Sequence, residues 1–328
     1  MILAGDIGGT KSLLALFAPG GDPRTARGEQ NFPSRNYPGL EAVLKDFLKE
    51  VPEPVELACF GVPGPVVEGR CETPNLPWVV DARELRRLTK ADVVLINDLE
   101  ATGYGIALLR EDELLPLSQG RPAPQANAAL IAPGTGLGEA ILFWDGQQHR
   151  PSASEGGHAS FAPQNDLEMK FLQYLKKDFD HASYDRVVSG SGLKRIYDFL
   201  KSIDYAEEPD WLHQELARAD DPAALISRVA LEGKAELCLK ALDLWVDAFG
   251  AEAGNLALKA LATAGLYLGG GIAPKILPKL KDGTFLTAFQ NKGRLATLLG
   301  HIPIRVILNP KTALFGAARF ALAQQKGW

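Results

Sequence analysis

The sequence predicts an α/β protein with layered sheets and helices, organised as two domains. Apolar strand-like runs alternate with amphipathic helical stripes, a pattern typical of α/β layers. The 328 residues are enough for two domains with large buried cores. A strand, a glycine turn and a second strand occur twice, in segments 2–17 and 130–142. This repetition suggests a duplicated fold whose halves both face one ligand.

The chain opens on a predicted β-hairpin. The apolar run 2–4 indicates a buried strand that reaches Asp6, and the run 13–17 is too short for a helix before a Pro-Gly-Gly turn. Two strands joined by a glycine turn are therefore expected. Asp6 stands at the end of the first strand, where its carboxylate is placed to hold a hydrated Mg²⁺ ion.

The turn of this hairpin has the composition of a phosphate-binding loop. Adjacent glycines let backbone N–H groups approach a phosphate closely, and a threonine adds a hydroxyl donor. The residues concerned are Gly8, Gly9 and Thr10. Two alternatives stay open, an ordinary hairpin turn and a P-loop. The stretch misses the P-loop pattern only by Thr10 in place of its last glycine, but a P-loop requires a helix over 11–17.

The rest of the N-terminal half continues the alternation. The expected strands are 26–32, 55–62 and 93–96, and the expected helices are 38–50 and a segment from 97 to about 110. A rigid polar and aromatic loop lies at 72–78, where Trp78 serves either as a wall of a binding site or as structural stiffening. The last strand runs directly into the polar pair Asn97-Asp98.

The second half begins after a proline-rich segment, 120–125, that is a plausible crossing point between domains. Its repeated strand–turn–strand pattern carries Gly134, Thr135 and Gly136 in the turn. A third glycine turn follows strand 266–268, at the end of a strand, where open α/β sheets bind ligands. The remaining expected elements are a long helix 232–264, a helix after Pro274, a strand 304–308 and a closing helix 312–325.

Charge and composition argue against several classes of function. The net charge is −5 and no basic block is present, so neither a nucleic acid nor an anionic membrane is an expected partner. No stretch reaches the length of a transmembrane helix, and Met1 leads into a core strand rather than a signal peptide. The cysteines Cys59, Cys71 and Cys238 lack metal-ligand spacing and are expected to be reduced thiols of a cytoplasmic protein.

Motifs along nearly the whole chain together resemble those of bacterial glucokinases. This family is a branch of the actin-like ATPase and hexokinase superfamily that lacks the zinc motif of repressor-type sugar kinases. Each motif alone is weak, but all of them in this order are hard to produce by accident. They are Gly5-Asp6-Ile7-Gly8-Gly9-Thr10, Thr73 to Trp78, Asn97-Asp98, Gly134-Thr135-Gly136-Leu137-Gly138, Glu155-Gly156-Gly157-His158, Ser189-Gly190, Gly254-Asn255-Leu256 and Gly269-Gly270-Gly271-Ile272.

The resemblance implies a two-domain actin-like ATPase (ribonuclease H-like) fold with a cleft between the domains. The smaller α/β domain would comprise 1–110 and 312–328, and the larger would comprise 111–311. The implied activity is ATP-dependent phosphorylation of glucose on its 6-hydroxyl, with Mg²⁺. Glucose and ATP would be the partners of a cytoplasmic homodimer.

The resemblance also assigns roles in catalysis and sugar binding. Asp98 would be the general base that accepts the proton of the sugar hydroxyl, a role worth about 10²–10⁴-fold in rate. An aspartate there is also a favoured helix N-cap, and both roles could hold. Asn97, Glu155 and His158 would bind sugar hydroxyls through their donors and acceptors. A metal role for the Glu155/His158 pair is disfavoured because no third ligand stands nearby.

The glycine turns would bind the nucleotide. Segments 6–10 and 134–136 would bracket the phosphates, while Gly269, Gly270 and Gly271 would lie near the adenosine. Phosphoryl transfer needs positioning and charge neutralisation more than covalent help, so backbone cradles, Mg²⁺ and one base suffice.

One position departs from the family pattern. The family carries a glutamate ahead of Val187-Val188-Ser189-Gly190 that touches the sugar near its reducing end, and this chain has Asp185. An aspartate is one methylene shorter, so it must reach further, act through water or leave the contact weaker. Two alternatives therefore stay open: a kinase of the same fold for another hexose or an N-acetylhexosamine, and a non-catalytic regulator that binds sugar and ATP.

Overall fold

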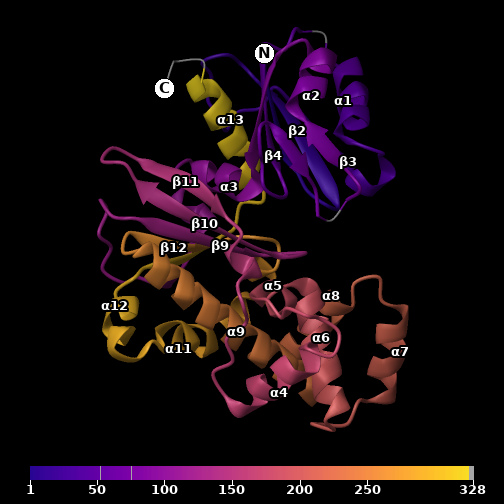
Figure 1. Cartoon of the computed structure of the whole chain (residues 1–328), viewed down its shortest axis with the longest axis vertical. Helices are drawn as coiled ribbons and strands as arrows, with labels where there is room; N and C mark the ends of the chain where they lie inside the picture. Colours follow the sequence, from indigo (N-terminus) through magenta and orange to yellow (C-terminus); the bar gives the residue numbers. More distant parts are fainter. Residues whose placement is uncertain (52, 75, 325–328) are drawn as a thin grey trace. The chain divides into compact units, whose positions relative to one another are not determined.

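The computed structural model describes residues 1–51, 53–74 and 76–324 (Figure 1). They form two compact units. The first comprises Met1–Leu114, Gln147–Ala153 and the chain from Asn309 onward, and the second comprises Leu115–Gly146 and Ser154–Leu308. The first crossing between units therefore precedes the proline-rich segment. The short segment Gln147–Ala153, which we expected in the larger domain, groups with the first unit.

A five-stranded sheet forms the centre of the first unit. Its strands are β1 (Ile2–Ile7), β2 (Lys11–Phe17), β3 (Gly28–Pro33), β4 (Leu57–Val62) and β7 (Asp92–Asn97), in the spatial order β3-β2-β1-β4-β7. β1 and β2 form the predicted antiparallel hairpin, whereas β1, β4 and β7 run parallel. Because the segment after the glycine turn is a strand, the P-loop alternative is excluded.

Helices cover both faces of this sheet. Successive side chains of a strand point to opposite faces. On one face, Leu3 and Phe60 pack with α1 (Leu40–Lys49) and α2 (Ala82–Thr89). On the other, Ile2 and Ala4 pack with α3 (Asp98–Ile106) and α13 (Thr312–Gln324). The apolar run at the N-terminus is therefore buried on both sides, as predicted.

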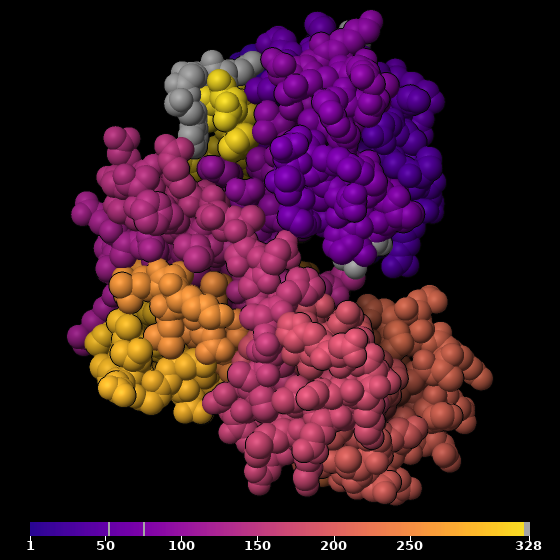
Figure 2. Space-filling model, in the orientation of Figure 1, coloured from indigo at the N-terminus to yellow at the C-terminus, as the bar shows by residue number. Residues whose placement is uncertain are grey.

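The closing helix α13 lies directly against α3, although about two hundred residues separate them in the sequence. A Cβ atom built on Gly316 of α13 would overlap the backbone carbonyl oxygen of Ala101 in α3. Glycine at this position therefore sets how closely the two helices approach. Figure 2 shows the yellow side chains of α13 packed beside indigo and purple residues of the first unit.

Smaller elements complete the first unit. They are a two-stranded hairpin of β5 (Arg70–Glu72) and β6 (Val79–Asp81), strand β11 (His149–Ser154), and the 3₁₀ helices η1 (Ser34–Asn36) and η2 (Glu111–Glu113). Helix α2 was not among the expected elements.

The sheet of the second unit repeats the arrangement of the first. It comprises five strands of a six-stranded sheet, β10 (Leu137–Trp144), β9 (Ala128–Pro133), β12 (Gly265–Leu268), β13 (Ile304–Ile307) and β8 (Leu114–Ser118), in this spatial order. β9 and β10 form an antiparallel hairpin, and β9, β12 and β13 run parallel. The four strands β10, β9, β12 and β13 have the same spatial order and the same relative directions as β2, β1, β4 and β7 of the first unit. This topology agrees with the duplication predicted from the two glycine turns.

Helices dominate the rest of the second unit. They are α4 (Asp166–Leu175), α5 (Tyr184–Val187), α6 (Gly190–Ser202), α7 (Asp210–Arg218), α8 (Pro222–Leu231), α9 (Glu236–Ala260), α10 (Leu277–Leu280), α11 (Thr284–Gln290) and α12 (Ala296–Gly300), with 3₁₀ helices η3 (Gly156–His158), η4 (Ala273–Ile276) and η5 (Gly293–Leu295). The long helix α9 passes through the core, where Trp245 and Phe249 are fully buried. No helix in the described part of the chain is long and apolar enough to cross a membrane.

Two of the helices that are shorter than predicted, α3 and α9, have an identifiable cause in the backbone. α3 ends at Ile106 because Leu108 and Leu109 donate to the carbonyls of Gly105 and Ile106 in tight three-residue turns. α9 is confined to Glu236–Ala260 by the left-handed residues Gly233 and Leu261, with φ of +68° and +47°.

Candidate active site

The first unit places Asp6, Asn97 and Asp98 at one edge of its sheet. In the register of the parallel strands, Asp6 lies opposite Gly61, and Asn97 lies opposite the next residue of β4. Adjacent strands are about 4.8 Å apart, so β1 and β7 end about 10 Å from each other. The carboxyl edge of parallel strands is where open α/β sheets bind ligands. The predicted Mg²⁺ residue and the predicted base therefore share one edge.

Two buried serines hold the turn of the first hairpin. The Gly8 N–H donates to the Lys11 carbonyl at 3.0 Å, and the Ser34 hydroxyl donates to the Gly8 carbonyl at 2.7 Å. The Ser34 N–H donates to the Thr10 carbonyl at 3.0 Å, and the hydroxyls of Ser12 and Ser34 lie 2.9 Å apart. Sequence reasoning missed both serines. A serine at the start of an otherwise apolar strand was the available signal.

The environment of Asp6 suits a hard cation. Burial raises the pKa of the Asp6 carboxyl to about 6, and the nearby Lys11 ammonium partly offsets this effect. A carboxylate that pays a desolvation penalty is stabilised by added positive charge, and oxygen ligands are those that Mg²⁺ prefers. The residue present therefore fits the ion that the sequence predicts.

Asn97 fixes the start of α3 and so the position of Asp98. The Asn97 side-chain oxygen accepts the Leu99 N–H at 2.9 Å, and the Glu100 carboxylate accepts the Asn97 N–H at 3.0 Å, which forms a capping box. The Asn97 amide nitrogen donates to the Gly64 carbonyl at 3.1 Å. Asp98 is the first helical residue, and its Oδ1 also accepts the Leu99 N–H, at 2.9 Å. The N-cap role considered for Asp98 thus belongs to Asn97.

The second unit places its two glycine turns side by side. The turn formed by residues 134–137, called here the Gly-Thr-Gly turn, joins β9 to β10, and the Gly134 N–H donates to the Gly136 carbonyl at 2.8 Å. The turn after β12 begins with Gly269, whose N–H donates to the carbonyl of Ile131 in β9 at 2.9 Å. Both turns therefore lie at the carboxyl ends of neighbouring parallel strands.

The predicted sugar-binding residues of the second unit gather around Leu137. The side chains of Glu155 and His158 are more than half exposed, and their Oε2 and Nε2 atoms lie 3.9 Å apart. A Cβ atom on Gly157 would overlap the Leu137 carbonyl, so this loop lies directly against the start of β10. The Leu137 N–H donates to Asp185 Oδ1 at 2.8 Å. Within the described residues, no cluster of three or more metal-ligating side chains occurs here or elsewhere.

A buried pair of glutamates lies beneath this loop. Glu139 of β10 and Glu252 of α9 are 1% and 0% exposed and share a hydrogen bond. Burial, and then the charge of Glu252, raise the pKa of Glu139 well above its ordinary value, which favours the protonated form of its carboxyl. Asn255 donates to Glu252 at 2.8 Å and to the Tyr184 hydroxyl at 3.3 Å. Sequence reasoning missed this pair, although an acid inside the apolar strand β10 was a usable signal.

Trp78 is a structural residue of the first unit. Its side chain is 2% exposed, and its indole N–H donates to the Tyr37 carbonyl at 3.0 Å. Of the two roles left open for Trp78, burial in the core favours structural stiffening.

Comparisons with known proteins find relatives that match nearly the whole chain. A family model described as Glucokinase matches residues 3–324. A glucokinase of Nostoc sp. is 43% identical, covering 97% of this chain and 98% of the relative. The crystal structure of a glucokinase from an Antarctic psychrotroph is similar with a TM-score of 0.80 and 30% identity, covering 98% of each chain. A glucokinase of Balamuthia mandrillaris, solved in complex with glucose, has a TM-score of 0.83 at 22% identity, covering 98% of this chain and 93% of the other, and supports the fold alone.

Proposed function

Because the chain belongs to the glucokinase family, we propose that it transfers the γ-phosphoryl group of ATP to the 6-hydroxyl of glucose, with Asp98 as general base. Its fold is that of the actin-like ATPases, and its enzyme class is that of the hexokinase-type phosphotransferases. The observation that carries the assignment of Asp98 is its fixed place at the first position of α3, on the same sheet edge as Asp6.

The phosphates of ATP would bind to the backbone of the glycine turns. The serine contacts that fix Gly8 also fix the direction of the hairpin turn, which comprises Gly8, Gly9 and Thr10. Gly134, Thr135 and Gly136 supply the second cradle, and Gly269, Gly270 and Gly271 would lie near the adenosine. Asp6 would hold Mg²⁺ through water, and the ion when bound would neutralise charge on the phosphate oxygens.

Asp98 would accept the proton of the attacking sugar hydroxyl. The N-terminus of α3 carries partial positive charge, which favours the ionised carboxylate at neutral pH. The capping box formed by Asn97 and Glu100 holds this helix end in place, so the base is positioned before the sugar binds. Pre-positioning of this kind is what a general base requires.

Glucose hydroxyls would be bound by Asn97, Glu155, His158 and Asp185. The exposure of Glu155 and His158 leaves their polar atoms available, and each can pair with more than one hydroxyl. Asn97 already uses its amide group in two internal hydrogen bonds, so its remaining N–H and lone pair would face the sugar. Asp185 has one oxygen engaged with Leu137, which would leave Oδ2 for the sugar.

The proposal includes the organisation of the protein. The domains would be 1–110 with 312–328 and 111–311, closing on sugar and ATP and thereby excluding water. The three cysteines are buried and form no disulfide within the described residues, which supports a cytoplasmic location. The expected homodimer can be tested by light scattering of the purified chain.

The decisive experiment is Mg²⁺-dependent ADP release from the purified protein. Glucose is compared with mannose, fructose, N-acetylated hexoses and a blank without sugar. Preferential turnover with glucose is expected. Faster turnover with another hexose would make that hexose the assigned substrate. Substantial ATP hydrolysis without sugar would contradict the proposed dependence of ATP turnover on bound sugar.

A further inference from the structure

We propose that Asp185 is a positioning residue that braces the Gly-Thr-Gly turn and thereby governs nucleotide binding, beyond any contact it makes with the sugar. The inference rests on the proposed function, because it takes this turn to be a phosphate cradle. It assigns to Asp185 a role on the phosphate side of the site, whereas the sequence predicts one on the sugar side only.

The turn is held at both ends by the segment 185–190, which runs from within α5 to the first residue of α6. At its far end, the Leu137 N–H donates to Asp185 Oδ1 at 2.8 Å. At its near end, the Gly190 N–H donates to the Gly134 carbonyl at 3.0 Å. A glycine-rich turn has large conformational freedom of its own, so these two external contacts restrict it. The bond to Asp185 is the stronger of the two because its acceptor is charged.

The carboxylate of Asp185 lies in direct contact with the turn. A Cβ atom built on Gly136 would stand 2.5 Å from Asp185 Oδ1, which is too close for any non-bonded pair. The space that a side chain at position 136 would occupy is therefore filled by the carboxylate oxygen. Glycine at position 136 therefore lets the carboxylate lie against the turn without being displaced.

The brace is itself anchored in the core. The Ser189 hydroxyl donates to the Asp185 carbonyl at 2.7 Å, and the Trp245 indole N–H donates to the Ser189 carbonyl at 3.0 Å. The Tyr184 N–H donates to the Ala159 carbonyl at 3.0 Å, which links the same short helix to the loop that carries His158. Asp185 is thus held in place by contacts to α9 and to this loop, and it in turn restricts the motion of the Gly-Thr-Gly turn.

The electrostatic setting is compatible with a phosphate nearby. A carboxylate next to a phosphate cradle would repel the nucleotide unless its charge were compensated. Oδ1 is compensated by the Leu137 N–H, and the Arg195 guanidinium of α6 lies close enough to interact electrostatically with Asp185. Removal of the carboxylate therefore removes a constraint on the turn rather than simply relieving repulsion.

The test measures nucleotide binding in the absence of sugar. Mg²⁺ with a non-hydrolysable ATP analogue is titrated calorimetrically into the wild-type chain and into Asp185→Ala and Asp185→Asn. We expect Asp185→Ala to weaken binding by about tenfold or more, because a hydrogen bond to a charged group is lost. Asp185→Asn keeps an oxygen that can accept the Leu137 N–H and is expected to stay within about threefold of the wild type.

A second readout is independent of binding and of folding yield. The hydrogen exchange rate of the Leu137 amide, measured by NMR, should rise at least tenfold in Asp185→Ala and stay near the wild-type value in Asp185→Asn. A residue that contacts only sugar would leave both nucleotide affinity and this exchange rate unchanged, and that result would overturn the inference.

The inference and the proposed function fail in different ways. A wild-type chain that binds no nucleotide would overturn the proposed function and, with it, this inference. A wild-type chain that binds nucleotide and phosphorylates glucose, with an Asp185→Ala variant altered only in its KM for sugar, would overturn the inference alone.

Discussion

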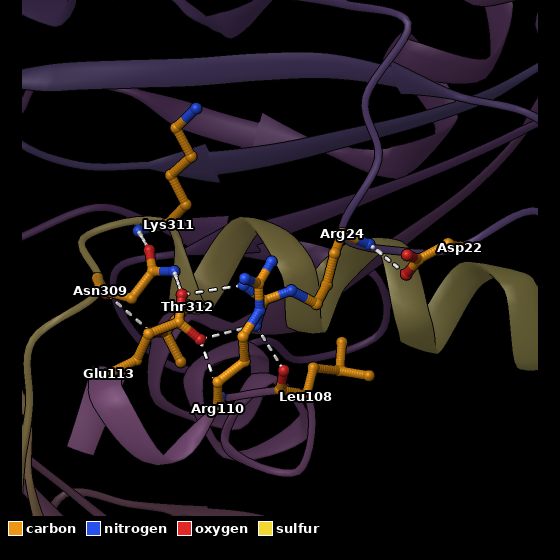
Figure 3. A network of polar contacts seen from close by, with 8 residues as sticks. All are labelled: Asp22, Arg24, Leu108, Arg110, Glu113, Asn309, Lys311 and Thr312. Carbon is orange, nitrogen blue, oxygen red and sulfur yellow. Dashed lines mark hydrogen bonds and ion pairs between the residues drawn. The ribbon is translucent and has the colours of Figure 1, made fainter.

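Arg24 and Glu113 form a bidentate ion pair that joins the loop after β2 to the 3₁₀ helix η2 (Figure 3). The guanidinium nitrogens donate to the two carboxylate oxygens at 2.7 and 2.8 Å. Asn309, just before α13, donates to the same carboxylate at 2.6 Å, and Arg24 also lies over the Phe315 ring of α13 at 5.1 Å. Glu113 therefore fastens the closing helix to the rest of the first unit.

Replacement of Glu113 by Gln should make the first unit less stable at neutral pH and less sensitive to acid. The pKa of Glu113 is lowered from 4.5 to about 2, mainly by its hydrogen bond with Arg24. A carboxyl with a lowered folded-state pKa contributes stability above its unfolded value, and this contribution is lost as pH falls from about 4.5 to about 2. We expect a loss of about 1–3 kcal/mol at pH 7.

The measurement is the free energy of unfolding in urea at pH 7, 5 and 3. The control is Glu84→Gln, which affects an exposed ion pair with Arg87 and should cost less than about 1 kcal/mol. An equal loss for Glu113→Gln at pH 7 and at pH 3 would contradict the assigned role of this carboxylate.

Gly316→Ala should destabilise the protein although alanine is the better helix former. The added Cβ would overlap the Ala101 carbonyl, and overpacking costs about 1–3 kcal/mol against about 1 kcal/mol of gained helix propensity. A lower thermal midpoint is expected in calorimetry. Gly28→Ala is the matched control, because a Cβ there meets no atom within 4 Å. A Gly316→Ala variant as stable as the wild type would show that α3 and α13 separate freely.

Glu139→Gln should change how stability depends on pH. The folded-state pKa of Glu139 is raised, so the folded chain keeps a proton that the unfolded chain releases near pH 4.5. The stability that this residue contributes is present below pH 4.5 and is lost as pH rises through the raised folded-state pKa. Glutamine mimics the protonated form, so the variant should gain stability relative to the wild type as pH rises.

Thermal midpoints of both proteins at pH 5, 6.5 and 8 test this prediction. The exposed Glu72, substituted in the same way, serves as the control. A constant difference in midpoint between Glu139→Gln and the wild type across this range would refute the protonated state of Glu139.

Asp98→Asn should lower kcat by about 10²–10⁴-fold, because an amide cannot accept the proton of the attacking hydroxyl. The KM for sugar should change little, since asparagine keeps the size and the hydrogen-bonding oxygen. Initial rates of ADP release across glucose concentrations separate the two parameters. Asp92→Asn, at the exposed start of the strand β7 that leads to Asp98, is the control. Near-normal kcat in Asp98→Asn would remove Asp98 from the role of base.

Local sequence patterns, such as apolar runs and glycine turns, were sufficient to predict most of the strands and helices of the fold. The apolar runs at both hairpins were confirmed as strands, because burial on both faces leaves an apolar run at the start of β1 and along β9. The helix boundaries were less accurate. The left-handed residues that limit α9 are a glycine and a leucine, and no sequence rule assigns such a conformation to Leu261.

The sequence by itself determined the α/β class, the three glycine turns, the strand-end residues Asp6 and Asp98 and the family. Each of these depends on neighbours along the chain. Only the tertiary structure decided that Asn97 caps α3, that Glu139 is buried against Glu252, and that Asp185 contacts the Gly-Thr-Gly turn. The contacts of Glu139 and Asp185 join residues far apart in the sequence. The cap of α3 is a choice between two adjacent polar residues, Asn97 and Asp98. All three depend on packing in three dimensions, which local propensity does not encode.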